Sequence, residues 1–195
     1  KTSTIKNLAS GKDVKSTESC LKNCGISITN NLNGGKIING DTFQNPIKEL
    51  DCGNSGTTMR LLSGLLAGKK VEATLFGDRS LSNRPMGRII RPLSQMKLNI
   101  YSKNDKPPIN IKKSDIQGIE YHSNTSSAQV KSAVIFSGLG ATNTTTYYEP
   151  ILSRNHTEIM LESVGANIKT NNNKIEIKNM PHPLLPLNMK VPADP

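Results

Sequence analysis

A polar stretch from Asn54 to Arg60 has the composition of an anion-binding helix start. It combines an amide, three hydroxyls, a glycine and a guanidinium directly before an apolar run. Asn54 or Ser55 can cap the helix that this run predicts, and Gly56 lets a ligand approach the backbone closely. The free N–H groups and the dipole of a helix start favour an anion at this position. A plain helix cap with no ligand is the alternative interpretation of these residues.

A helix start of the same kind recurs about 70 residues later, at Ser127, which indicates an internal repeat. Ser127 and Gln129 offer hydrogen bonds there, and Lys131 offers a positive charge. In a pseudo-symmetric domain the two helix starts can face one cleft. The alternative interpretation of Lys131 is a solvated position on the outside of its helix.

Arginines follow in a second polar stretch. Arg84 stands directly before Pro85, which pushes the arginine backbone towards an extended conformation. A guanidinium placed before a Pro-initiated helix suits bidentate capture of a carboxylate or a phosphate. Arg88 and Arg91 fall in the helix that follows, where an ordinary surface position is the alternative. We interpret Asp78, earlier in the same stretch, as a local cap or ion-pair partner.

A matching arrangement precedes a later helix. Ser153 and Arg154 occupy there the places that Asn83 and Arg84 occupy before the earlier one. His156 lies in the first turn of this later helix. A general base, a helix cap and a ligand-binding group are all compatible with a histidine at that position.

Internal repetition explains why these groups recur. Three segments, each ending in an isoleucine at position 28, 100 or 168, have the pattern of an amphipathic helix that runs into a strand. In the third helix the apolar residues at helical spacing are Ile159, Met160, Leu161 and Val164. Gly25 and Gly165 stand where helices commonly stop, and Asn172 and Asn173 suit the turn of a β-hairpin.

The repeat also predicts the domain organisation. Each unit is expected to hold a helix, a strand, a second helix and two strands, with a further strand leading into the next helix. The units cover about residues 1–54, 55–126 and 127–195, and the first lacks its opening helix. The chain ends in Val-Pro-Ala-Asp-Pro, where another helix is expected to start, so both ends look cut from a longer polypeptide. We therefore predict one mixed α/β (α+β) domain over residues 1–195 with a shared helical core.

Composition narrows the class of protein. With 34% hydrophobic and 4% aromatic residues, the 195-residue chain can bury an aliphatic core, which argues against disorder. No apolar run approaches the ~18 residues of a membrane span. We expect a cytoplasmic protein, or a plastid one if the source is a plant or an alga. The cysteines, Cys20, Cys24 and Cys52, are too few and odd in number for a disulfide framework, and no neighbouring ligands indicate a metal.

A formal net charge of +10 predicts an electrostatic field that gathers anions. Nucleic acid is one such anion, but no single stretch is a basic run and few aromatic residues are present to stack on bases. Small phosphorylated or carboxylated substrates fit as well or better. We expect no cofactor.

Together, these motifs resemble the EPSP synthase (3-phosphoshikimate 1-carboxyvinyltransferase) family. The resemblance covers nearly the whole chain and is carried, in the family's order, by LDCGNSGTTMRLLSGLLAG, GDRSLSNRPMGRIIRPL, SAQVKSAVIFSGL, SRNHTEIMLESVGANI and VPADP. It implies one half of a two-domain inside-out α/β barrel, built from three copies of a helix-and-sheet unit. It also implies transfer of the enolpyruvyl group of phosphoenolpyruvate to the 5-hydroxyl of shikimate 3-phosphate, through a tetrahedral intermediate and without a metal.

The resemblance assigns roles to individual residues. Contacts with shikimate 3-phosphate are implied for Ser127, Ala128, Gln129, Ser153 and Arg154. Contacts with phosphoenolpyruvate are implied for Gly56, Arg84 and Gln129. The residues implied to shape or support the site are Asn54, Thr57, Arg60, Lys131 and His156. The inhibitor glyphosate is implied to occupy the phosphoenolpyruvate site against Gly56.

Other features of the family are absent from the sequence. The Lys-Ser-x-x-x-Arg segment and the second domain with its acid–base residues are missing, so no catalytic residue is assigned and the fragment alone is expected to be inactive. Asn83 and Asn155 stand where Lys and Asp are common. The expected partners are the two anionic substrates and the missing domain, in a complete enzyme that is a monomer and binds neither nucleic acid nor membrane.

Two other hypotheses stay open. The related UDP-N-acetylglucosamine enolpyruvyl transferases place a reactive cysteine in a loop near the arginine that corresponds to Arg84, but the stretch FGDRSLSNRP holds no cysteine. A free-standing anion- or nucleic-acid-binding module would need natural chain ends, and the broken repeat argues against those.

Overall fold

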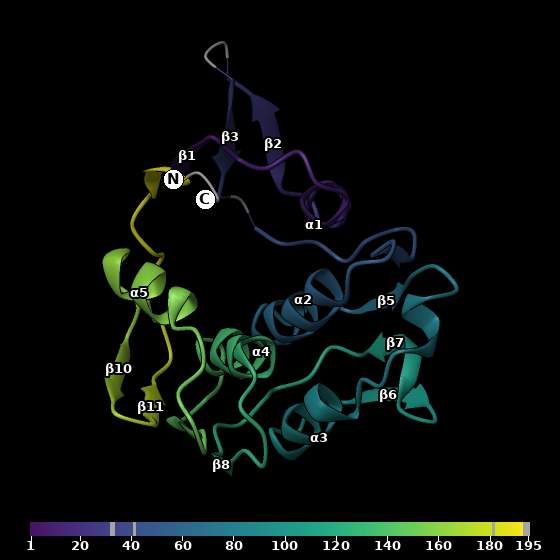
Figure 1. Ribbon diagram of the computed structural model, residues 1–195, viewed down its shortest axis with the longest axis vertical. Helices are drawn as coiled ribbons and strands as arrows, with labels where there is room; N and C mark the ends of the chain where they lie inside the picture. Colours follow the sequence, from purple (N-terminus) through teal and green to yellow (C-terminus); the bar gives the residue numbers. More distant parts are fainter. Residues whose placement is uncertain (32–33, 41, 181, 193–195) are drawn as a thin grey trace.

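Two helices lie at the centre of the fold, in a computed structural model that describes residues 1–31, 34–40, 42–180 and 182–192. These are α2 (Gly56–Gly68) and α4 (Ala128–Gly138), which Figure 1 shows side by side with the sheets around them. The described part of the chain holds three four-stranded sheets and five α-helices. This mixed α/β architecture confirms the fold class that the repeat predicts.

The elements follow one another in the order expected for three units. The first unit contains β1 (Thr2–Lys6), α1 (Lys12–Asn23), β2 (Ser27–Asn30), β3 (Gly35–Asn39) and β4 (Leu50–Asp51). The second contains α2, β5 (Ala73–Phe76), the 3-10 turn η1 (Leu81–Asn83), α3 (Gly87–Gln95), β6 (Ile100–Lys103), β7 (Lys106–Ile111) and β8 (Glu120–His122). The third contains α4, β9 (Thr145–Tyr148), α5 (His156–Ser163), β10 (Ile168–Asn171), β11 (Lys174–Ile177) and β12 (Asn188–Lys190).

The three sheets share one topology, but the boundaries of the sheets differ from those of the units by one strand. Their orders are β4-β5-β7-β6, β8-β9-β11-β10 and β12-β1-β3-β2, so the last strand of each unit joins the sheet of the following one. The pairs β4–β5 and β8–β9 are parallel, and α2 and α4 are the crossover helices that such pairs require. The parallel pair β12–β1 comes from opposite ends of the described chain, and no crossover helix in that part of the chain joins it.

Small residues explain the close packing of the two central helices. A side chain at Gly64 would overlap the backbone of Ala133, and one at Gly68 would overlap the backbone of Phe136. Ser137 Oγ also donates a hydrogen bond across the interface to the carbonyl oxygen of Gly64, at 3.0 Å. One small residue of each Ser-Gly-Leu sequence, Gly64 in α2 and Ser137 in α4, therefore lies where the two helices meet.

The predicted helix stops and the hairpin turn are confirmed. Gly25 and Gly165 follow α1 and α5 with φ angles of +88° and +80°, a conformation that glycine adopts without strain. Asn172, with φ of +51°, begins the turn between β10 and β11, which pair in antiparallel fashion. Residues 193–195 of the terminal motif, where a further helix is expected to start, lie outside the described residues.

Helix α5 differs from the expected pattern of an apolar buried face. Leu161 and Val164 are buried, but Ile159 is 54% exposed and Met160 is 41% exposed. Met160 borders an apolar groove of about 560 Å³ between α2, α4, α5 and the segment 183–187. Its main apolar lining consists of Leu61, Phe136, Met160, Leu161, Leu184 and Leu185. Part of the apolar face of α5 therefore has no covering element among the described residues.

Candidate functional site

Of the two residues predicted to cap α2, one forms the cap and the other bonds to neighbouring side chains. Ser55 is the capping residue, because its Oγ accepts the N–H of Thr58 at 3.1 Å. Asn54 does not cap the helix. Its amide instead lies between Asp78 and Arg84, with Nδ2 donating to Asp78 Oδ2 at 2.8 Å and Oδ1 accepting from Arg84 Nη2 at 2.6 Å.

Two guanidiniums converge on the first residue of α2. A methyl group at Gly56 would lie 2.9 Å from Arg60 Nη1 and 3.3 Å from Arg84 Nη1. Burial lowers the pKa of Arg60, and the positive charges of Arg84 and Arg88 lower it further. The start of α2 thus gathers an excess of positive charge in a partly buried place, which favours an anionic ligand. The backbone of Arg84 is extended as predicted, with φ of −80° and ψ of 137°.

A glutamine joins the two repeated helix starts. Arg60 Nη1, on α2, donates to Gln129 Oε1 at 2.6 Å, and Gln129 Nε2, on α4, donates back to Thr57 Oγ1 at 2.8 Å. The expectation that the two helix starts face one place therefore agrees with the geometry. Ser127 caps α4, since its Oγ accepts the N–H of Val130 at 3.4 Å, and Ala128 is the first residue of that helix.

Lys131 differs from both interpretations of its sequence position. The side chain is 1% exposed and forms ion pairs with Glu149 Oε1 at 2.9 Å and with Glu158 Oε1 at 2.7 Å. It is therefore neither a solvated surface lysine nor an unpaired charge that faces a ligand. Its two carboxylate partners come from the residue that follows β9 and from α5, far along the chain, which is why no local spacing indicated them.

Ser153 is tied to this buried ion cluster. Its Oγ donates to Glu149 Oε2 at 2.7 Å, and Lys131 Nζ donates to its carbonyl oxygen at 3.5 Å. Burial raises the pKa of the Glu149 carboxyl, but hydrogen bonds from Ser153 and Lys131 outweigh this, and the pKa lies below its ordinary value. Glu158 Oε2 is buried with no hydrogen-bond partner in the described part of the chain. Sequence reasoning missed both glutamates.

Arg154 and His156 stand beside Ser153 at the start of α5, and both are exposed. His156 is the first residue of the helix, as predicted, and Asn155 occupies the capping position without a side-chain cap. Neither residue takes part in the hydrogen bonds of Asn54 with Asp78 and Arg84, or in those of Gln129 with Arg60 and Thr57.

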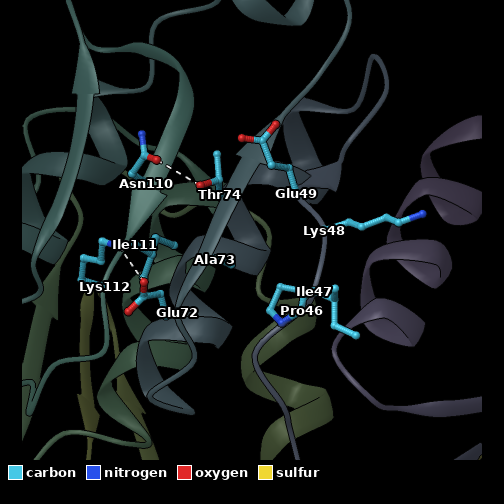
Figure 2. Close-up of a pocket in the computed structure, with 10 residues that line it drawn as sticks. All are labelled: Pro46, Ile47, Lys48, Glu49, Glu72, Ala73, Thr74, Asn110, Ile111 and Lys112. Carbon is cyan, nitrogen blue, oxygen red and sulfur yellow. Dashed lines mark hydrogen bonds and ion pairs between the residues drawn. The ribbon is translucent and has the colours of Figure 1, made fainter.

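A pocket of about 190 Å³ lies elsewhere, between the segment 46–49 and strands β5 and β7 (Figure 2). Its polar groups largely satisfy one another, because Lys112 Nζ lies 2.6 Å from Glu72 Oε1 and Thr74 Oγ1 donates to Asn110 Oδ1 at 3.0 Å. No residue that the sequence singles out lines it. We therefore place the candidate site at the starts of α2 and α4.

The cysteines and the carboxylates give no sign of a metal centre. Cys20, Cys24 and Cys52 are buried free thiols, and Cys20 Sγ donates to the carbonyl oxygen of Asp51 at 3.4 Å. The described residues contain no cluster of three or more histidine, cysteine or acidic side chains suited to a metal ion. Nor does any described helix have the length and apolar character needed to cross a membrane.

Curated relatives resemble the chain along almost its whole length. The 3-phosphoshikimate 1-carboxyvinyltransferase of Thermodesulfovibrio yellowstonii is 44% identical over 98% of this chain and 46% of its own length. The enzyme of the same name from Desulforamulus reducens is 40% identical over 97% of this chain and 45% of its own length. The chain thus spans about 45% of the length of the relatives it matches.

Comparison with solved structures gives the same result. An EPSP synthase from Acinetobacter baumannii superposes with a TM-score of 0.92 at 38% identity, over 98% of this chain and 44% of that one. The sequence model of the family described as EPSP synthase (3-phosphoshikimate 1-carboxyvinyltransferase) matches residues 1–195. Sequence and fold lead to the same assignment, and the chain belongs to the EPSP synthase family.

Proposed function

We propose that this chain is the shikimate 3-phosphate-binding half of a 3-phosphoshikimate 1-carboxyvinyltransferase. The observation that carries the proposal is the convergence of Arg60, Arg84 and Gln129 on the paired starts of α2 and α4. Two cations, a bifunctional amide and the positive end of a helix dipole in one place suit a pair of anionic substrates.

The proposed contacts divide between the two substrates. Phosphoenolpyruvate is held by Gly56, Arg84 and Gln129. Shikimate 3-phosphate is held by Ser127, Ala128, Gln129, Ser153 and Arg154. Gln129 belongs to both sets, which is consistent with its place at the start of α4 and its bonds to Thr57 and Arg60 at the start of α2. Asn54, Thr57, Arg60, Lys131 and His156 support these residues.

In the proposed reaction, the 5-hydroxyl group of the sugar acid loses its proton as its oxygen bonds to C2 of phosphoenolpyruvate, and C3 takes up a proton. The bond between C2 and the phosphate oxygen then breaks, inorganic phosphate leaves, and loss of a proton from C3 restores the C2=C3 double bond as an enol ether. Both substrates are anions, so bringing them together costs Coulomb repulsion that the guanidiniums of Arg60 and Arg84 offset. Holding both in one cleft also fixes their mutual orientation.

We propose that a second domain and one further helix complete the enzyme. The chain spans less than half of its relatives, and the groups that move protons are expected in the remainder. The parallel pair β12–β1 lacks the crossover helix that α2 and α4 provide for the equivalent pairs. The apolar groove beside Leu61 and Leu161 has the lining that such a helix would need.

Phosphate release by the complete polypeptide tests this proposal. The wild type should release phosphate only when both substrates are present. Arg84→Ala should lower kcat/KM by about a hundredfold, the usual scale for a lost donor to developing charge. Arg79→Ala, which removes an exposed arginine from the same stretch, should stay within about twofold. No phosphate release from the wild type would refute the function, and equal losses in the two variants would refute the site.

A further inference from the structure

The amide of Asn54 has a fixed orientation between an acid and a base. An asparagine side chain has one end that donates and one that accepts. Its Nδ2 donates to Asp78 Oδ2 at 2.8 Å, and its Oδ1 accepts from Arg84 Nη2 at 2.6 Å. A carboxylate accepts only and a guanidinium donates only, so the amide can satisfy both neighbours in a single orientation.

Asp78 is itself anchored on both sides. Its Oδ1 accepts the N–H of Leu81 at 2.8 Å, and its own N–H donates to the carbonyl oxygen of Gly53 at 2.9 Å. The hydrogen bond from Leu81, followed by that from Asn54, lowers the pKa of the Asp78 carboxyl. Asp78 therefore holds the residue before Asn54 through its backbone N–H and the turn η1, which directly precedes Arg84, through its carboxylate.

An amide spacer has an electrostatic advantage over a direct ion pair. A carboxylate bonded to Arg84 would neutralise the guanidinium and occupy donors that an anionic ligand needs. With Asn54 between them, Asp78 orients the arginine through a neutral group. Arg84 keeps its charge, and its Nη1 remains turned towards the start of α2, 3.3 Å from the position of a methyl at Gly56.

We propose that Asp78 is a positioning residue that acts through Asn54 to hold Arg84 in place for phosphoenolpyruvate. The inference rests on the proposed function, since it assumes that Arg84 binds this substrate. It extends the local cap suggested by the sequence, because the same carboxylate that caps Leu81 also sets the direction of the Asn54 amide.

Steady-state kinetics of the complete polypeptide separate positioning from capping. Asp78→Ser keeps a hydroxyl that can cap the N–H of Leu81 but loses the acceptor for Asn54. We expect the KM for phosphoenolpyruvate to rise about tenfold, the scale of one hydrogen bond to a charged group. The KM for shikimate 3-phosphate should change by less than about twofold. Asp115→Ser, which removes a carboxylate paired with Lys70, is the matched control and should change neither KM.

A double-mutant cycle tests the route through the amide. Asn54→Ala should reproduce the selective rise in KM for phosphoenolpyruvate, and adding Asp78→Ser to it should have no further effect. An equal rise in both KM values, or a full effect of Asp78→Ser in the Asn54→Ala background, would overturn the inference. If Asp78→Ser does not fold, Asn54→Ala alone decides, because an unchanged KM for phosphoenolpyruvate contradicts the relay. A wild type that releases no phosphate would refute the proposed function instead.

Discussion

Gly56→Ala is the substitution whose effect the geometry predicts most directly. Gly56 is buried at the first position of α2, and its φ is not in the left-handed region. Alanine is therefore compatible with the backbone at this position. Any loss of function must come from the volume of the methyl group.

Two distances indicate how strongly Gly56→Ala should weaken substrate binding. The methyl would lie 2.9 Å from Arg60 Nη1 and 3.3 Å from Arg84 Nη1, against about 3.5–4.0 Å for an unstrained contact. The Arg60 guanidinium must withdraw by roughly 0.6 Å to reach that range, which strains its 2.6 Å bond to Gln129. We expect phosphoenolpyruvate binding to weaken by about 1–2 kcal/mol, or roughly 5- to 30-fold in KM.

The assay compares KM for both substrates and inhibition by glyphosate in the complete polypeptide. Glyphosate is expected to occupy the same volume, so its binding should weaken at least as much as the binding of phosphoenolpyruvate. The KM for shikimate 3-phosphate should stay nearly constant. Gly11→Ala is the control, because nothing lies within 4 Å of its Cβ position. An unchanged glyphosate affinity in Gly56→Ala would refute the steric reasoning.

Two further predictions concern the buried ion cluster around Lys131. Lys131→Met leaves two buried carboxylates without their cation and should lower the free energy of unfolding by about 3–5 kcal/mol. Lys70→Met removes an exposed ion pair and should lower it by less than about 1 kcal/mol. Urea titrations measure both losses, and equal losses would contradict the prediction. Because the pKa of Glu149 is lowered from 4.5 in the folded state, its contribution is present above that pH and is lost as the pH falls through the folded pKa. Unfolding free energies measured from pH 6 to pH 3 should therefore fall less steeply in Glu149→Gln than in wild type, and parallel profiles would assign the acid sensitivity to other groups.

Local patterns in the sequence predict the elements and most of their ends. Ser55 and Ser127 cap helices because a hydroxyl before an apolar run has few other roles, and Arg84 is extended because Pro85 excludes the helical region for its neighbour. The repeat predicts that two helix starts meet, and Gln129 provides the contact. These features depend on residues a few positions apart or on the period of the repeat.

Features that depend on distant pairs were not predictable in this way. The burial of Lys131 requires Glu149, which follows β9, and Glu158, which lies in α5. The exposure of Ile159 has a different cause, because amphipathic spacing indicates an apolar face but not which element covers it. Asp78 illustrates an intermediate case: its spacing to Leu81 indicates a cap, whereas its bond to Asn54 depends on the loop before α2.

The cations of this domain differ in what holds them, and this difference decides which can bind an anion. Arg60 and Arg84 are held by neutral amides, those of Gln129 and Asn54, so their orientation is fixed while their charge remains available. Lys131 is held by two carboxylates and has no charge left to offer. Lys131, two residues after Gln129, therefore holds Glu149, Glu158 and the backbone of Ser153 in place, and under the proposed function the charges of the substrates are left to the arginines. In an anion titration, Arg60→Gln and Arg84→Gln should therefore weaken the affinity for the anion much more than Lys131 variants that still fold.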